Sequence, residues 1–200
     1  MSESVKSITD TITLDNQDRL VQAYKDIIDS CAITGEDRVI SNSDARHAAY
    51  LLSVLFKHAK QKVQIFTGSL YKGVFGDKSL IENAIVFLKG GTDRKIQIAF
   101  QEKSFITNMR DHSLIKAIFA SLDKNELRGK MAIYDASDKD KYADITSHFT
   151  IMDGKAFRFE IDPVKMKAIA NFGDKESAVK LTEIFDFIIS NSQEVKLCAE

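Results

Sequence analysis

Hydrophobic residues recur along this chain with two different spacings. Where they return every three to four positions they form one face of a helix, and where they return every second position they form one face of a strand. The helical spacing covers residues 17–30, 41–59, 78–88, 111–122 and 175–190, and strand patterns cover 62–68, 94–100 and 130–134. This alternation of helices with strands predicts an α/β fold, a mixed β-sheet flanked by helices with parallel neighbouring strands.

The ends of the chain carry weaker patterns. Residues 1–16 are polar and rich in Ser and Thr, so a loose arm or a short edge strand is expected there. Short extended pieces are expected at 38–40 and 166–172. These patterns divide the chain into an N-terminal arm and helix over residues 1–40, an α/β domain over 41–190 and a tail over 191–200.

The most informative stretch, residues 146–160, predicts a β-hairpin. Hydrophobic and polar residues alternate on both sides of Asp153-Gly154, a dipeptide that favours a tight primed turn because both turn residues adopt positive φ. The polar residues then gather on one face of the hairpin, either as a ligand site or as a solvated face of a sheet. The alternation separates Phe149, Ile151, Phe157 and Phe159 from Thr150, Met152, Arg158 and Glu160.

This order of elements resembles a known family. An apolar strand ending in Asp-Gly, a second strand, a short loop and a terminal amphipathic helix are similar to the phospholipase D superfamily, whose signature is His-x-Lys-x-x-x-x-Asp. With Asp153 at the signature Asp, the signature Lys falls on His148 and the signature His on Thr146. Placing the signature His on His148 puts Thr150 and Lys155 at the other two positions, which is a poorer match. The resemblance therefore implies the superfamily's fold with a degenerate active site.

The resemblance extends over about residues 43–190 and carries expectations about function. The superfamily builds its active site from two halves, whereas this chain contains one, so a homodimer or pairing with a related chain is expected. Loss of the signature His removes the covalent phospho-histidine route. The preferred interpretation is a non-catalytic module that binds a partner protein, a nucleic acid or a phosphate-bearing ligand, such as a component of a bacterial multi-protein defence system. The alternative is a phosphodiesterase or nuclease that uses His148 in a non-standard arrangement at a dimer interface.

Candidate ligand-binding residues are His148, Lys155, Arg158 and Glu160, and the candidates for catalysis are His148 and Asp153. Each also has a structural explanation. A strand histidine either acts on a phosphate or proton or is merely structural. Asp153 suits the hairpin turn on its own, and an Arg158–Glu160 pair on a strand surface contributes little to stability. Lys155 with Arg158 suits a phosphate, an acidic partner or a solvated rim.

Other patterns exclude several classes of site. The spacings of phosphate-binding glycine loops are absent, and so is the Gly-x-Ser-x-Gly motif of a nucleophile elbow. His47, His58 and His112 have no partners at metal-ligand spacing, so neither a metal nor a cofactor is expected. Three aromatic residues around the first glycine-containing loop either stack a nucleic-acid base or pack in the core: Phe66, Tyr71 and Phe75.

The composition indicates a globular protein with no overall charge bias. Hydrophobic residues make up 44% of the 200, enough for one core, and a net charge of −1 provides no global basic field for nucleic acid or membranes. Cys31 and Cys198 indicate neither a disulfide framework nor a zinc site and favour a reducing compartment. The first residues lack the apolar core of a signal peptide, and no apolar run reaches the length of a membrane span. Cytoplasmic localisation without membrane insertion is therefore expected.

Overall fold

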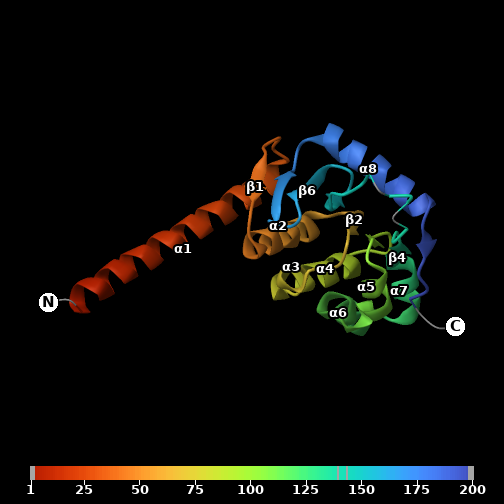
Figure 1. Cartoon of the computed structure of the whole chain (residues 1–200), viewed down its shortest axis with the longest axis horizontal. Coiled ribbons are helices and arrows are strands. Elements are labelled where there is room, and N and C mark those ends of the chain that lie inside the picture. The colour runs from red at the N-terminus through yellow and green to blue at the C-terminus, as the bar shows by residue number, and fades with distance from the viewer. Residues whose placement is uncertain (1–2, 139, 143, 198–200) are drawn as a thin grey trace.

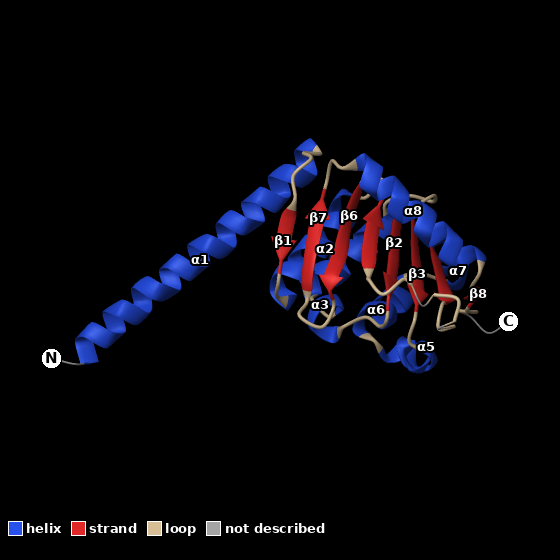
Figure 2. Ribbon diagram, turned by 45° about the horizontal axis from the view of Figure 1, so that its top comes forward, coloured by secondary structure: helices blue, strands red, loops and turns tan. Residues whose placement is uncertain are grey.

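A mixed sheet of eight strands runs through the part of the chain that this computed structural model describes, residues 3–138, 140–142 and 144–197 (Figure 2). Three neighbouring strands are parallel: β2 (Lys62–Thr67), β3 (Lys95–Phe100) and β4 (Met131–Asp135). The remaining strands pair antiparallel: β1 (Ile40–Asn42), β5 (Phe149–Met152), β6 (Ala156–Asp162), β7 (Lys167–Asn171) and β8 (Gln193–Glu194). The order across the sheet is β1-β7-β6-β5-β2-β3-β4-β8, which confirms the prediction of a mixed sheet with parallel neighbours.

Helices cover both faces of this sheet (Figure 1). The core on one face includes residues from α2 (Ala45–His58), α3 (Lys72–Phe75), α4 (Lys78–Lys89), η1 (Met109–Asp111), α6 (Ser113–Ser121) and α7 (Lys124–Lys130), with α5 (Lys103–Asn108) packed beside them. The core on the opposite face forms under α8 (Lys175–Ser190). None of the helices in the described ranges combines the length and the apolar character needed to cross a membrane.

The long N-terminal helix, α1 (Glu3–Thr34), extends away from the sheet (Figure 1). Its C-terminal part packs against α2, where Ile28 and Cys31 are buried. The expectation of a loose arm or edge strand over residues 1–16 is therefore wrong from residue 3 onward. No Gly or Pro interrupts residues 3–30, so nothing in the sequence ends the helix that the pattern at 17–30 predicts.

Local capping signals fix where several helices begin. The side chains of Asp44, Asp77 and Asp174 accept hydrogen bonds from backbone N–H groups in the first turns of α2, α4 and α8. The predicted start of this helix at residue 41 is wrong, because Ser41 lies in β1, where it pairs with Ile169. Helix α8 begins at residue 175 and ends at residue 190, as predicted, and Asp174 caps its first turn.

Short elements lie in the expected glycine-containing loop and in two segments for which the sequence predicts neither a helix nor a strand. Residues 103–111 and 124–130 hold α5, η1 and α7, and the glycine-containing loop holds α3. A sequence signal for α7 was present, because Asp123 and Glu126 have the spacing of a capping box and form one. Residues 193–194 in the segment expected to be a tail form β8, which pairs with the end of β4.

The predicted hairpin is confirmed, but its solvated face is not. Asp153 and Gly154 have φ values of 53° and 63°, and the Lys155 N–H donates to the Met152 carbonyl at 2.9 Å, as a primed turn requires. Thr150 pairs with Arg158, and both are buried where β5 and β6 contact α2. The interpretation of this polar face as a solvated sheet face is therefore wrong, because helix α2 covers it.

Candidate functional site

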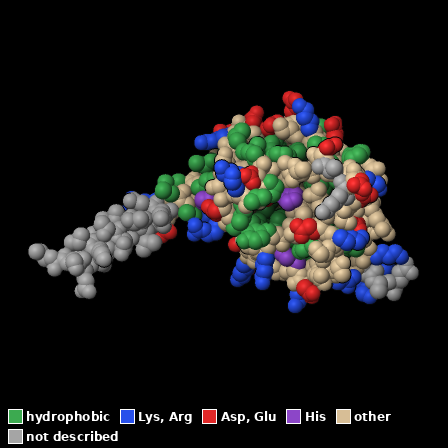
Figure 3. All heavy atoms as spheres, viewed as in Figure 1, with side chains coloured by type: hydrophobic (Ala, Val, Ile, Leu, Met, Phe, Trp, Pro, Cys, Tyr) green, Lys and Arg blue, Asp and Glu red, His purple; other side chains and the backbone are tan. Residues whose placement is uncertain are grey.

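A polar pocket opens where the carboxyl end of β2 meets the beginning of β5. Open α/β sheets place ligand sites at the carboxyl ends of their parallel strands. The cavity has a volume of about 290 Å³. Its apolar wall comes mainly from the α3 region and the β6–β7 turn: Tyr71, Val74, Phe75, Pro163, Val164 and Met166. Over α2 and α3, hydrophobic side chains gather beside a histidine on the surface (Figure 3).

His148 lies in this pocket with both ring nitrogens engaged. Its Nδ1 is 2.9 Å from the Glu160 Oε2, and the Gly68 backbone N–H donates to its Nε2 at 3.0 Å. A backbone N–H is only a donor, so Nε2 carries no proton. The proton therefore resides on Nδ1 and is donated to Glu160. His148 is a neutral imidazole held in one tautomer.

Arg158 completes a buried network around Glu160. Its Nη1 donates to the Glu160 Oε1 at 2.8 Å, and its Nε donates to the Asn42 side-chain oxygen at 3.2 Å. Arg158 is only 5% exposed, and Asn42 in β1 is also buried. Burial acts to raise the pKa of the Glu160 carboxyl, but the hydrogen bonds from His148 and Arg158 outweigh burial and hold that pKa below its ordinary value. Glu160 is therefore ionised at neutral pH.

Of the predicted site residues, the structure brings together His148, Arg158 and Glu160. Asp153 and Lys155 lie at the hairpin turn, at the other end of β5. His148 and Asp153 are five positions apart along an extended strand, a span of roughly 16 Å. The Asp153 carboxylate instead accepts hydrogen bonds of 2.7, 2.9 and 2.7 Å from the backbone N–H groups of residues 60, 61 and 62. Asp153 thus joins the hairpin turn to the beginning of β2.

Sequence reasoning missed three residues of the site: Gly68, Glu102 and Asn42. A Cβ atom added to Gly68 would lie 2.9 Å from the Glu102 Oε1 and 3.4 Å from the His148 Nε2, so a side chain there would displace one of them. A glycine directly after a buried strand was the available signal, because glycine allows another group to approach the backbone closely. Glu102 and Asn42 carry no sequence pattern that distinguishes them.

The aromatic and histidine candidates divide between the pocket and the core. Phe66 is fully buried on the other face of the sheet against Phe149, whereas Tyr71 and Phe75 line the pocket. Among the other histidines, His47 contacts Asp44 and His112 accepts a hydrogen bond from the first turn of α6. No group of three potential metal ligands occurs among the described residues.

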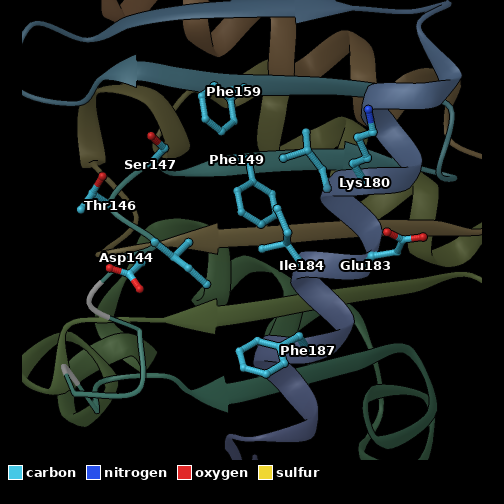
Figure 4. A pocket seen from close by; sticks show the side chains of 11 residues that line it. Asp144, Thr146, Ser147, Phe149, Phe159, Lys180, Glu183, Ile184 and Phe187 are labelled. Atoms are coloured by element: carbon cyan, nitrogen blue, oxygen red, sulfur yellow. The ribbon is translucent and has the colours of Figure 1, made fainter.

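A second, apolar groove of about 650 Å³ lies between α8 and the β5–β6 hairpin (Figure 4). Phe149 and Phe159 form its floor, and Ile184 and Phe187 come from α8. Thr146 lines this groove rather than the polar pocket. Residues two apart on a strand share a face, but β5 begins only at Phe149, so Thr146 and His148 are free to point in different directions.

The polar pocket has little capacity to attract a phosphate. The charge of Arg158 is offset by Glu160, Glu102 adds a second carboxylate, and His148 is neutral. The carboxylates of this pocket can accept hydrogen bonds from the hydroxyl, amine or amide groups of a ligand. They disfavour a phosphate, which needs a cation whose charge is not already offset.

Comparison with protein-family models gives no match, and comparison with curated proteins also gives none. Among solved structures the chain is similar to TrmBL2, described as an archaeal chromatin protein with a novel mode of DNA binding (TM-score 0.55, 11% identity, 96% of this chain and 68% of that chain). It is similar to Nuc from Salmonella typhimurium, a phospholipase D family member (TM-score 0.54, 12% identity, 80% and 99%). NucT from Helicobacter pylori matches with a TM-score of 0.47, at 12% identity over 80% and 99% of the two chains. At these identities the likeness concerns the fold, which is phospholipase D-like.

Proposed function

We propose that this chain is a non-catalytic phospholipase D-like module that acts by binding a partner. The observation that carries this proposal is the engagement of both His148 nitrogens. A nucleophile or general base needs a lone pair directed at the substrate, and Nε2, the unprotonated nitrogen, already accepts the Gly68 N–H. Thr146, at the position of the signature His, lines the apolar groove on the other side of the hairpin.

Nucleic acid is the proposed class of partner. TrmBL2, which shares the fold over 96% of this chain, is described as a chromatin protein that binds DNA. The support is an analogy of fold, because function resides in particular sites and one fold serves many functions. The polar pocket offers no net positive charge, so the contacts to phosphates would lie on another surface.

A homodimer is part of the proposal, with the apolar groove along α8 as the surface between copies. Ile184 and Phe187 are 39% and 55% exposed, which leaves hydrophobic area for a second copy to cover. Lys180, Glu183 and Asp144 place both charge signs on the same groove, so two copies of this surface can meet with opposite charges facing each other. Size-exclusion chromatography with light scattering at micromolar concentration tests this, and a monomer contradicts it.

The non-catalytic role is tested by incubating the protein with single- and double-stranded nucleic acid and with bis-p-nitrophenyl phosphate, with and without divalent metal. No turnover is expected, while fluorescence anisotropy should detect binding of nucleic acid. Turnover that His148→Ala abolishes and the matched variant His47→Ala preserves would contradict the proposal, because His47 lies outside the polar pocket.

One observation favours the alternative of a phosphodiesterase or nuclease. Glu160 orients the Nδ1–H of His148, as a carboxylate orients the histidine of many hydrolases. A catalytic cycle would have to displace the Gly68 N–H from Nε2 before substrate could reach it. The same turnover assay decides between the two functions.

A further inference from the structure

A basic groove lies at the amino ends of β2 and β3, at the opposite end of these strands from the polar pocket. Its volume is about 990 Å³. Glycine, threonine and glutamine supply the rest of its lining beside four cations and one carboxylate: Lys60, Lys62, Arg94, Lys95 and Asp93. The function proposed above makes no use of this groove.

The charges of this groove add to one another because neighbouring strands bring them together. Lys62 pairs with Lys95 across the β2–β3 ladder, and Arg94 comes directly before β3. The hairpin turn, which Asp153 joins to residues 60–62, adds Lys155 to the same end of the sheet. The groove and the adjoining hairpin turn thus bring five cations together with two carboxylates, in a chain whose net charge is −1.

The five cations also keep their charge available. No ion pair within the described ranges involves any of them. Arg94 donates to the Phe87 carbonyl and lies over the Phe87 ring, which fixes its side chain without neutralising it. The two carboxylates leave the groove with a net positive charge, because Asp93 is the single acid among the described lining residues and Asp153 is directed at backbone N–H groups.

The lining of the groove favours a nucleic acid over a protein or a membrane. Among the residues that the structure describes, no apolar one lines the groove. Protein interfaces, by contrast, have an apolar centre, and membrane-surface helices insert apolar side chains. Surfaces that bind nucleic acid are more polar and more positive, and most of their contacts reach phosphates through Lys, Arg and backbone N–H groups. Gly129 leaves the backbone accessible, because a Cβ added there would meet nothing within 4 Å, whereas the Arg94 guanidinium lies against Gly90.

We propose that this basic groove binds the phosphodiester backbone of nucleic acid without reading its sequence. The inference rests on the proposed function for the class of partner and adds the surface that holds it. The cations contact phosphates, and the bases find no apolar or aromatic platform in the groove. Binding is therefore driven by the release of counterions from the nucleic acid.

The test measures the anisotropy of a short labelled duplex over salt concentrations of about 50 to 300 mM. Lys60→Gln/Lys95→Gln removes two exposed groove cations, and Lys116→Gln/Lys165→Gln removes two exposed cations on α6 and the β6–β7 turn. The groove variant should flatten the slope of log affinity against log salt by about 2 and weaken binding roughly 50-fold near 0.1 M salt. The control variant should stay within a few-fold of the wild-type affinity.

Equal losses in the two variants, or no loss in the groove variant, would overturn the assignment of this surface while leaving wild-type binding in place. If the wild-type chain binds no duplex even at low salt, both the groove and the class of partner are wrong. Neither result touches the non-catalytic role, which the turnover assay judges separately. Because all four substituted lysines are exposed, each variant should fold as the wild-type chain does, and thermal melts by circular dichroism test this.

Discussion

The two faces of the β5–β6 hairpin reverse the usual distribution of polar and apolar residues. On the polar face, Thr150 and Arg158 are buried where the hairpin contacts α2, and Arg158 forms a hydrogen-bonded network with Glu160 and Asn42. The aromatic face is only partly covered, because α8 leaves a groove over Phe149 and Phe159. Buried polar groups are tolerated when they satisfy one another, and apolar surface remains open where a partner covers it. The covered face therefore stabilises the fold and orients His148, whereas the open face is the surface proposed to bind a second copy of the chain.

Removal of Arg158 should have the largest effect on stability. Arg158→Ala leaves the Glu160 carboxylate and the buried Asn42 side chain without their donor. The free energy of unfolding should fall by roughly 2–4 kcal/mol, the scale for breaking a buried charged pair. Urea denaturation measures this, with Lys165→Ala, an exposed lysine, as the control. A loss below that of the control would mean that the network contributes nothing to folding.

Gly154→Val tests the turn that holds the two faces in register. Gly154 has a φ of 63°, where a β-branched side chain is strained. The free energy of unfolding should fall by about 1–3 kcal/mol in denaturant melts. Lys155→Ala, at the neighbouring exposed position, should leave stability within about 0.5 kcal/mol of wild type. Equal melts for the two variants would show that the turn tolerates a side chain.

His148→Ala should destabilise the chain by about 1–2 kcal/mol, because the Gly68 N–H and Glu160 each lose a hydrogen bond in a partly buried site. From the sequence alone, an exposed strand histidine predicts less than about 1 kcal/mol. Denaturant melts distinguish the two values. A loss near zero would indicate that water replaces the imidazole, and the fixed tautomer would then be doubtful.

The pH dependence of stability should report on Glu160. Its folded-state pKa lies below the ordinary value of 4.5, so the unfolded chain binds the proton more readily and stability rises with pH through this range. The contribution is fully present above the unfolded-state pKa and is lost as pH falls through the folded-state pKa. Glu160→Gln should therefore be less stable than wild type at pH 7, and the difference should shrink below about pH 4.5. A difference independent of pH would exclude an ionised Glu160 from the network.

On the open face, Phe187→Ser should barely change the stability of the monomer, compared at a concentration low enough for both chains to be monomeric, because the side chain is 55% exposed. A shift within about 0.5 kcal/mol is expected in the same melts. If the groove along α8 joins two copies, the variant should be a monomer by light scattering under conditions where the wild-type chain is a dimer. A variant that stays dimeric would place the interface elsewhere.

The parts of the fold that the sequence predicts well depend on neighbours in the chain. Asp174 and the helical spacing after it define α8, and Asp153-Gly154 with its flanking alternation defines the hairpin. The coarse α/β architecture follows from the same local patterns. Each of these features is decided within about 15 residues, the range over which periodicity and capping act.

The features that could not be predicted from the sequence depend on contacts between residues far apart in the chain. The alternation in β5 and β6 gives the period of the strands, but α2, about a hundred residues earlier, decides which face is buried. The Gly68–His148 contact joins residues 80 apart, and the Asp153 carboxylate meets residues 91 to 93 positions away. The sequence therefore predicts that His148, Arg158 and Glu160 share a face. It does not predict that the Gly68 N–H donates a hydrogen bond to His148.

The central claim is that His148 is a neutral imidazole whose Nε2 accepts the Gly68 N–H. Long-range ¹H–¹⁵N correlation spectra of the imidazole at neutral pH test it most directly, with hydrogen exchange of the Gly68 amide recorded on the same sample. The account predicts a protonated Nδ1, an unprotonated Nε2 and a Gly68 amide protected from exchange. A proton on Nε2, or a Gly68 amide that exchanges as fast as an exposed loop, would contradict it and return His148 to the candidates for catalysis.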